Sequence, residues 1–160
     1  MAQQDATEGR KVVATNRSAH FRFAIEERVE AGLVLSGSEV KSLRAGNANL
    51  ADAYAIPKGG ELFLVNCRIG PYDPAAALGH EPTRPRKLLL RRAELSRLLS
   101  KVTERGFSLV PLQIYFKGGY AKTEIALCRG KTHEDRREDI KARETRREID
   151  RAMKGARARR

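Results

Sequence analysis

The sequence predicts a mainly β fold: an OB-like six-stranded barrel with inserted helices, followed by a basic C-terminal tail. Three observations predict it. About six short stretches alternate apolar and polar residues or are bounded by Gly and Pro, as strands are. One longer segment has helical periodicity, and residues 131–160 carry very few large apolar residues. A flat sheet with helices on one face is the alternative that these patterns leave open.

Composition divides the chain into three parts. Residues 1–16 are polar, and we expect them to be a flexible N-terminus. Residues 17–130 are expected to form the barrel, because a segment of this length can fill one hydrophobic core. Residues 131–160 form the basic tail, which we expect to be disordered or nascent-helical in isolation.

The first elements of the barrel are predicted in residues 21–46. Residues 21–35 alternate apolar and polar side chains and break at Ala31-Gly32, which predicts two strands joined by a tight connection. Residues 37–46 are typical of a short helix, with Ser38 as its N-cap and Gly46 just past its end.

A hairpin, a loop and a helix are predicted in the middle of the chain. Residues 53–56 and 61–65 flank a Pro-Lys-Gly-Gly turn. Residues 71–85 contain four of the six prolines, which predicts a loop. From Arg91 the period changes, and one helical face carries the apolar residues Leu95, Leu98, Leu99 and Val102, with Gly106 ending the helix.

Two final strands are predicted at residues 109–116 and 120–128, on either side of Gly118-Gly119. Their aromatic residues could stack on nucleobases, but packing in the barrel core is the preferred interpretation; they are Tyr115, Phe116 and Tyr120.

The charge of the chain favours a polyanionic partner. Lys and Arg number 32 against 20 Asp and Glu, giving a net charge of +12 and a pI near 10.2. Such a field attracts nucleic acid or an anionic membrane. No apolar run approaches the length of a membrane span, so we expect no membrane partner. No signal-peptide core is visible near the N-terminus, which predicts a cytoplasmic protein.

Signals of catalysis and metal binding are weak. Cys67 and Cys128 lie far apart in apolar surroundings, which predicts small buried residues rather than a disulfide or a zinc site. The three histidines lack metal-ligand spacing, and neither a P-loop nor a GxSxG motif occurs. We therefore expect no enzyme activity, no cofactor and no metal.

Two basic segments could contact phosphates. Residues 83–87 place Arg84, Arg86 and Lys87 beside prolines that stiffen the backbone, although an ordinary solvated turn would look the same. Lys41 and Arg44 lie three residues apart and so project from one side of the predicted short helix. A solvated helix face is an equal alternative for this second pair.

The pattern of the tail predicts a helix that is only partly formed in the free chain. Residues 129–160 contain thirteen Lys and Arg against seven Asp and Glu, interleaved at helical spacing. Thr132 and Asp135 have the spacing of an N-terminal cap. Pairs such as Asp139 with Arg143 would add a few tenths of a kcal/mol each, roughly, which favours a nascent helix. We expect it to become ordered against RNA, with a solvated tail as the alternative.

Several motifs together resemble one protein family. They are Asn16-Arg17, IEERVEAG at residues 25–32, GSEVKSLRAG at 37–46, HEPTRPRKLLL at 80–90, Arg129-Gly130-Lys131 and Asp135-Arg136-Arg137 before Ile140-Lys141. In this order, over roughly residues 12–155, they resemble the SmpB family, the SsrA-binding proteins that partner transfer-messenger RNA in bacterial ribosome rescue. Thr132 stands where the family commonly has a second Lys.

The resemblance implies an OB-like barrel without catalysis of its own. Its body would bind the tRNA-like domain of transfer-messenger RNA, and its tail would enter the decoding site and the empty mRNA channel of a stalled ribosome. The implied partners are therefore this RNA and the ribosome, and we expect a monomer. A structural ribosomal RNA-binding protein is the alternative, and an RNA-processing enzyme is disfavoured.

The resemblance also assigns residues. The implied RNA-binding set is Asn16, Glu30, Glu39, Lys41, Arg44, Arg84, Arg86, Lys87 and Lys122. Glu30 and Glu39 would accept hydrogen bonds from base or ribose, or orient neighbouring arginines. The implied decoding-site set in the tail is Lys131, Asp135, Arg136, Arg137, Lys141 and Arg143.

Overall fold

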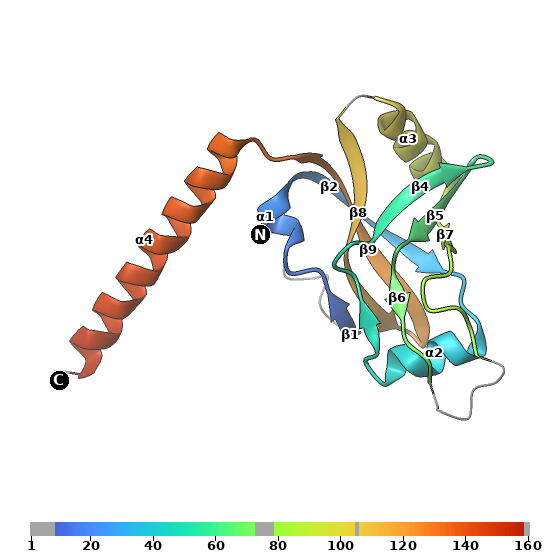
Figure 1. The fold of residues 1–160 in the computed structure, drawn as a ribbon, viewed down its shortest axis with the longest axis horizontal. Helices are drawn as coiled ribbons and strands as arrows, with labels where there is room; N and C mark the ends of the chain where they lie inside the picture. The colour runs from blue at the N-terminus through green and yellow to red at the C-terminus, as the bar shows by residue number, and fades with distance from the viewer. Residues whose placement is uncertain (1–8, 73–78, 105, 159–160) are drawn as a thin grey trace.

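The computed structural model describes residues 9–72, 79–104 and 106–158, and six strands of its larger sheet form a closed ring. Figure 1 shows these strands between α2 and α3. The ring runs in the order β8–β4–β5–β7–β2–β9, and β9 closes it by pairing with β8. These neighbours are antiparallel. The predicted OB-like barrel with inserted helices is therefore confirmed, and the flat sheet is excluded.

Two hairpins supply four of the six ring strands. β4 (Tyr54–Lys58) and β5 (Glu61–Val65) join at Gly59-Gly60, and β8 (Phe107–Lys117) and β9 (Tyr120–Gly130) join at Gly118-Gly119. All four glycines have positive φ, between 59° and 81°, a conformation that costs glycine little. Local turn chemistry therefore predicted both hairpins.

The long strand β2 (Phe23–Leu33) replaces the two strands predicted in residues 21–35. Gly32 does not break the chain but continues β2, where it pairs with Leu89 of β7 (Arg86–Leu89). A Cβ atom at Gly32 would lie 3.3 Å from the Leu89 side chain, so this glycine permits a close strand approach. The short helix α1 (Ala19–Arg22) precedes β2.

Strand β7 was not predicted. Arg86 and Lys87 belong to it, whereas the sequence placed both in a basic loop. β7 bridges β5 and β2, so it is the strand that completes the ring. The rest of the predicted loop, residues 71–85, includes residues 73–78, which lie outside the described residues.

The prediction of a flexible N-terminus through residue 16 is wrong for residues 10–15. They form β1 (Arg10–Thr15), which pairs with β8 from Lys117 to Gln113. Residues 1–8 lie outside the described residues. β3 (Ala48–Asn49) and β6 (Arg68–Ile69) form a second, two-stranded sheet that was also not predicted.

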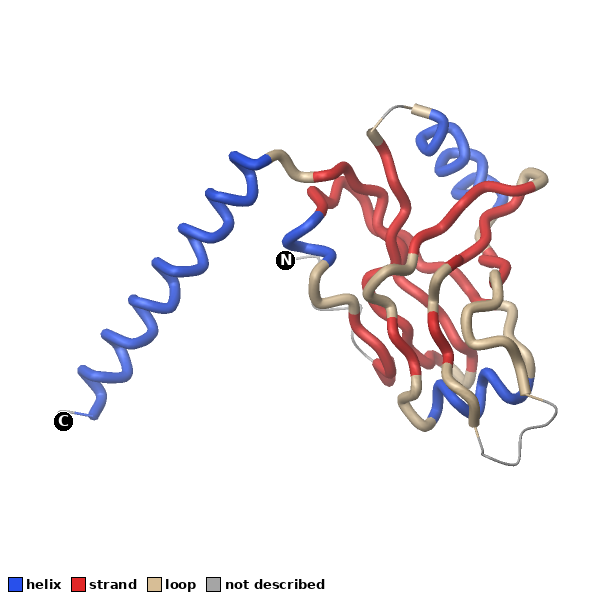
Figure 2. Tube along the Cα trace, in the orientation of Figure 1, coloured by secondary structure: helices blue, strands red, loops and turns tan. Residues whose placement is uncertain are grey.

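Two helices lie at opposite ends of the barrel (Figure 2). α3 (Arg92–Thr103) buries Leu98 fully and packs Leu95, Leu99 and Val102 against the core, as the periodicity predicted. The N-cap of α2 (Gly37–Arg44) is Ser36, two residues before the expected Ser38. The Ser38 hydroxyl instead contacts His80 Nδ1 at 2.9 Å.

The core fills the ring with aliphatic side chains, including Leu62, Leu64, Ile114 and Ile125, all fully buried. Tyr115 and Phe116 are buried as expected, whereas Tyr120 is 74% exposed. Cys67 and Cys128 are buried free thiols, and burial raises the pKa of each to about 11.

The tail forms a single helix, α4 (His133–Ala158), which projects away from the barrel (Figure 1). The predicted cap is present: Thr132 Oγ1 accepts from Asp135 N–H at 3.3 Å, and Thr132 N–H donates to the Asp135 carboxylate at 3.1 Å. The predicted ion pairs between tail residues are not formed within residues 133–158. Exposed pairs of this kind gain little over hydration, so nothing holds their side chains together.

Candidate nucleic-acid interface

Glu39 organises the first cluster of charges, and it is fully buried at the start of α2. One carboxylate oxygen accepts from Ser36 N–H at 2.9 Å and from Arg84 Nη2 at 2.5 Å, while the other accepts from Arg86 Nε. Burial alone would raise the pKa of Glu39. The hydrogen bonds from Ser36, Arg84 and Arg86 outweigh burial and lower it to about 2. This carboxylate therefore stays ionised and holds two arginines.

Arg86 is a support and not a surface residue. Its side chain is completely buried, and besides Glu39 it donates to Cys67 O at 2.6 Å and Pro82 O at 3.1 Å. Arg84, by contrast, keeps 39% of its side chain exposed. Lys87 is similarly exposed and lies 3.6 Å from Glu61. Of the three predicted cations in this segment, only Arg84 and Lys87 can reach an external phosphate.

Glu30 organises the second cluster, on the outer face where β2, β9, β8 and β1 meet. Its carboxylate accepts from Lys122 Nζ at 2.9 Å and from the Tyr115 hydroxyl, and Arg10 and Lys117 lie at 3.4 and 3.7 Å. Burial opposes ionisation of Glu30, but the hydrogen bonds from Tyr115 and Lys122 lower its pKa overall. Glu30 therefore stays charged and gathers cations from three strands.

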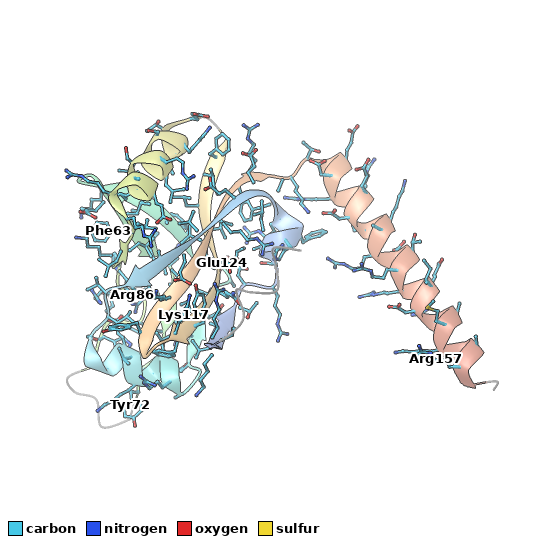
Figure 3. The ribbon with its side chains drawn as sticks, turned by 180° about the vertical axis from the view of Figure 1, so that it is seen from behind. Phe63, Tyr72, Arg86, Lys117, Glu124 and Arg157 are labelled. Carbon is cyan, nitrogen blue, oxygen red and sulfur yellow. The ribbon has the colours of Figure 1, made fainter. Side chains whose placement is uncertain are left out.

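Glu124 extends this cluster along β9. It receives hydrogen bonds from Arg10 Nη1 at 3.3 Å, Arg28 Nη1 at 3.4 Å and Gln113 Nε2 at 3.0 Å. Figure 3 shows Lys117 and Glu124 on the same part of the barrel. The two carboxylates of this face, which we call the Glu30 face, are outnumbered by four cations: Arg10, Arg28, Lys117 and Lys122. An excess of positive charge remains for an anionic ligand.

Helix α2 brings two more cations to the rim of the barrel. Lys41 and Arg44 are both exposed. Arg44 stacks over the Phe116 ring at 4.6 Å, next to Tyr115 and Lys117 on β8, and Lys41 lies over Tyr72 at 5.6 Å. Phe116 belongs to the core and points to the opposite side of β8 from Tyr115 and Lys117, so these contacts hold the two cations at the rim without joining them to the Glu30 face. Both side chains remain exposed, as the alternative of a solvated helix face also expects.

Asn16 does not lie on this surface. The structure buries it, with its side-chain amide donating to Pro111 O at 3.1 Å and its backbone N–H donating to Leu112 O at 2.7 Å. Ser18 Oγ donates to the remaining amide oxygen at 3.2 Å. Asn16 therefore fixes the exit of β1 against β8, which makes it a buried support in this structure and not an exposed contact.

The tail residues of the predicted set divide between body and solvent. Lys131 turns back to the barrel, and Asp135 is occupied in the cap of α4, where the Thr132 hydrogen bonds lower its pKa. Arg143 lies 5.8 Å from the Phe21 ring, and Arg136 is half-buried. Arg137 and Lys141 are exposed one turn apart.

Sequence reasoning missed four members of the Glu30 face: Arg10, Arg28, Lys117 and Glu124. Strand alternation could have placed Arg28 and Glu30 on one face, since they are two residues apart. Arg10 gave no local signal, because its segment looked like a frayed terminus. Among the described residues, no group of His, Cys, Asp and Glu could hold a metal ion. None of the described helices is long and apolar enough to cross a bilayer.

The fold and the charged surface together define a class of protein, the small basic barrel proteins. Ionised carboxylates hold the cations of this barrel in place, and such an arrangement favours binding to a polyanion. Comparison of the chain with known proteins agrees with this class and identifies one family within it. The family model described as SmpB protein matches residues 13–155. The chain belongs to the SmpB family.

Individual relatives support the same membership. The chain is 62% identical over 146 residues to an SsrA-binding protein of Myxococcus xanthus, covering 91% of this chain and 90% of that one. It is 61% identical over 152 residues to an SsrA-binding protein of Anaeromyxobacter sp. strain Fw109-5, covering 95% and 92%. A solved structure described as "tmRNA-SmpB: a journey to the center of the bacterial ribosome" matches with 45% identity and a TM-score of 0.64, covering 79% of this chain and 92% of that one.

Proposed function

We propose that the chain binds the tRNA-like domain of transfer-messenger RNA and delivers it to stalled ribosomes for trans-translation, in the cytoplasm and as a monomer. Its action is binding, without catalysis of its own. The observation that carries the proposal is membership of the SmpB family, whose model spans residues 13–155. The names of the relatives and of the structural neighbour point to the same RNA and to the ribosome.

The Glu30 face and the rim of α2 are the proposed RNA-binding surface. Their cations are held at defined positions by carboxylates or aromatic rings, which lowers the entropy lost when they meet phosphates. Glu39 and Arg86 act from inside, by fixing Arg84 and the start of α2. Lys41, Arg44, Arg84, Lys87 and Lys122 are the predicted residues that can contact RNA directly.

The tail has a separate role in the proposal. The surface of α4 is mainly charged, with exposed cations such as Arg137 and Lys141. It would occupy the decoding site and the empty mRNA channel, where phosphates surround it on several sides. Body and tail therefore bind different RNAs.

The test compares three RNA ligands, of which the duplex is matched in charge. Binding of the full chain to transfer-messenger RNA, bulk tRNA and an RNA duplex is measured at near-physiological salt. We expect tight binding to transfer-messenger RNA only. Equal affinity for all three would reduce the function to electrostatic attachment and would favour a structural ribosomal RNA-binding protein instead.

A further inference from the structure

The two carboxylates of the Glu30 face lie directly opposite each other on neighbouring strands. In the register of β2 with β9, Glu30 pairs with Glu124. Residues that are directly opposite in an antiparallel pair project from the same face, with their Cβ atoms about 5 Å apart. Like charges at this spacing repel each other and weaken the sheet. The pair therefore needs a positive charge between its two carboxylates.

Arg10, the first residue of β1, supplies this charge. Its Nη2 lies 3.4 Å from Glu30 Oε2, and its Nη1 lies 3.3 Å from Glu124 Oε2. The side chain crosses β8 to reach them, and its guanidinium lies over the Tyr115 ring, 4.3 Å from the ring centroid. One residue of β1 thus neutralises two facing charges on β2 and β9.

Arg10 differs from the other cations of this face because its charge is used within the protein. Only 12% of its side chain is exposed, against 31% for Lys122 and 46% for Lys117. Both Nη atoms donate to carboxylates, and Nε is buried without a hydrogen-bond partner in the described part of the chain. A buried donor without a partner costs stability, so the contacts with the carboxylates and the ring must outweigh that cost.

This arrangement leaves one oxygen of Glu30 able to accept a further hydrogen bond. Oε2 accepts from Arg10 and from the Tyr115 hydroxyl, whereas Oε1 accepts only from Lys122 Nζ among the described residues. A carboxylate oxygen can accept two hydrogen bonds, and 29% of the Glu30 side chain is exposed. Oε1 can therefore also accept from a base N–H or a ribose hydroxyl of RNA.

We propose that Arg10 is a positioning residue of the RNA-binding surface, which neutralises the facing pair Glu30 and Glu124 and keeps Glu30 Oε1 available to a hydrogen-bond donor of RNA. Without Arg10, repulsion from Glu124 displaces the Glu30 carboxylate and leaves negative charge beside the phosphates. The inference rests on the proposed function, because Glu30 has a ligand only if RNA binds this face.

The test is a double-mutant cycle between Arg10 and Glu124. Arg10→Met removes the guanidinium but keeps an unbranched apolar chain, and Glu124→Gln removes the facing charge. Affinity for transfer-messenger RNA is measured over a range of salt concentrations for the parent, both single variants and the double variant. Thermal unfolding of each chain is recorded without RNA. Lys11→Met is the matched control, because Lys11 is exposed, follows Arg10 in β1 and projects from the other face of the strand.

We expect Arg10→Met to bind transfer-messenger RNA about tenfold more weakly. The slope of log affinity against log salt should not change, because no phosphate contact is lost. Glu124→Gln should raise affinity by at most about twofold in the parent, since it removes one screened negative charge, but by about tenfold in the Arg10→Met background. Lys11→Met should stay within about twofold of the parent.

Three results would overturn the positioning role. The first is undiminished affinity in Arg10→Met. The second is a salt slope that falls by about one, which would make Arg10 a direct phosphate contact. The third is an equal gain from Glu124→Gln in both backgrounds, which would reduce its charge to a general effect. Arg10→Lys keeps the charge without the forked guanidinium, so it should bind with intermediate affinity, and it takes the place of Arg10→Met in the cycle if that variant does not fold.

Failure of the proposed function gives a different result. If the parent chain does not prefer transfer-messenger RNA to bulk tRNA, the function is wrong and the RNA-binding role of Glu30 is lost with it. The unfolding midpoints without RNA then decide whether Arg10 neutralises the carboxylate pair. Arg10→Met should lower the midpoint, and adding Glu124→Gln should restore it, whereas additive changes would overturn the neutralisation itself.

Discussion

In the barrel, charged side chains pair with partners that are distant in the sequence, whereas in the tail the charged side chains are solvated. Glu39 contacts Arg84 and Arg86, which lie 45 and 47 residues away in sequence. Within α4, the opposite charges spaced for pairing do not pair among residues 133–158. Burial makes a charge part of the fold, and exposure leaves it available to a ligand. The same residue types therefore stabilise the fold where they are buried and stay available to a ligand where they are exposed.

Removing the tail should have the largest effect on function. A chain truncated after Gly130 should lose tagging on stalled ribosomes completely, while its affinity for transfer-messenger RNA stays within about twofold, because the Glu30 face is intact. Binding and tagging assays on the same preparation measure both. A large loss of affinity for the free RNA would show that the two regions share one binding surface.

Removing a buried partner should cost stability next. Arg86→Met leaves the Glu39 carboxylate buried with fewer donors, so the free energy of unfolding should fall by about 3–5 kcal/mol in denaturant titrations. The control is Lys87→Met, the neighbouring residue, whose half-exposed pair with Glu61 is 3.6 Å long and contributes less than about 1 kcal/mol. Equal losses in both variants would contradict the distinction between buried and exposed pairs.

Low pH should destabilise the buried ion pairs of Glu39 without any mutation. The pKa of Glu39 is about 2 in the folded chain against an ordinary value of 4.5. Its contribution to stability is therefore full above pH 4.5 and is lost as pH falls toward 2, and Glu30 acts in the same direction. Unfolding free energies measured on both sides of pH 4.5 should decline on the acid side. Stability independent of pH there would mean that Glu39 titrates normally.

The smallest effect concerns the surface itself. Lys41→Ala with Arg44→Ala should weaken RNA binding and reduce the slope of log affinity against log salt by up to about 2, one for each lost phosphate contact. Arg91→Ala with Arg92→Ala removes equal charge at the start of α3, at the other end of the barrel. That control should leave the slope unchanged, and equal slopes for the two double variants would remove α2 from the interface.

Sequence patterns predicted the elements whose signals are local. The two Gly-Gly hairpins, the apolar stripe of α3 and the Thr132–Asp135 cap each depend on neighbouring residues. The prolines before β7 read as loop, and its pairing with β2 and β5 needs residues more than twenty positions away. Strand β1 was not predicted for the same reason, because its polar residues form a strand only by pairing with β8.

The candidate site followed the same rule. Motif resemblance pointed to Glu30, Glu39 and Lys122, and the structure gathers cations around both carboxylates. The resemblance did not separate exposed contacts from buried supports, so Arg86 and Asn16 stood in the same RNA-binding set as the exposed cations. That distinction depends on which backbone carbonyls each side chain meets, and these are set by distant strands.

The closure of the ring also bears on how the chain is made. Arg10 pairs with Lys117 and Phe23 pairs with Gly130, partners separated by more than 100 residues. During synthesis, β1 and β2 must wait for β8 and β9, so the barrel forms late and slowly. A nascent chain released before Gly130 would leave β2 and β8 with unpaired edges, open to proteolysis and to aggregation. Translation as far as Gly130 is therefore a condition for the barrel to fold.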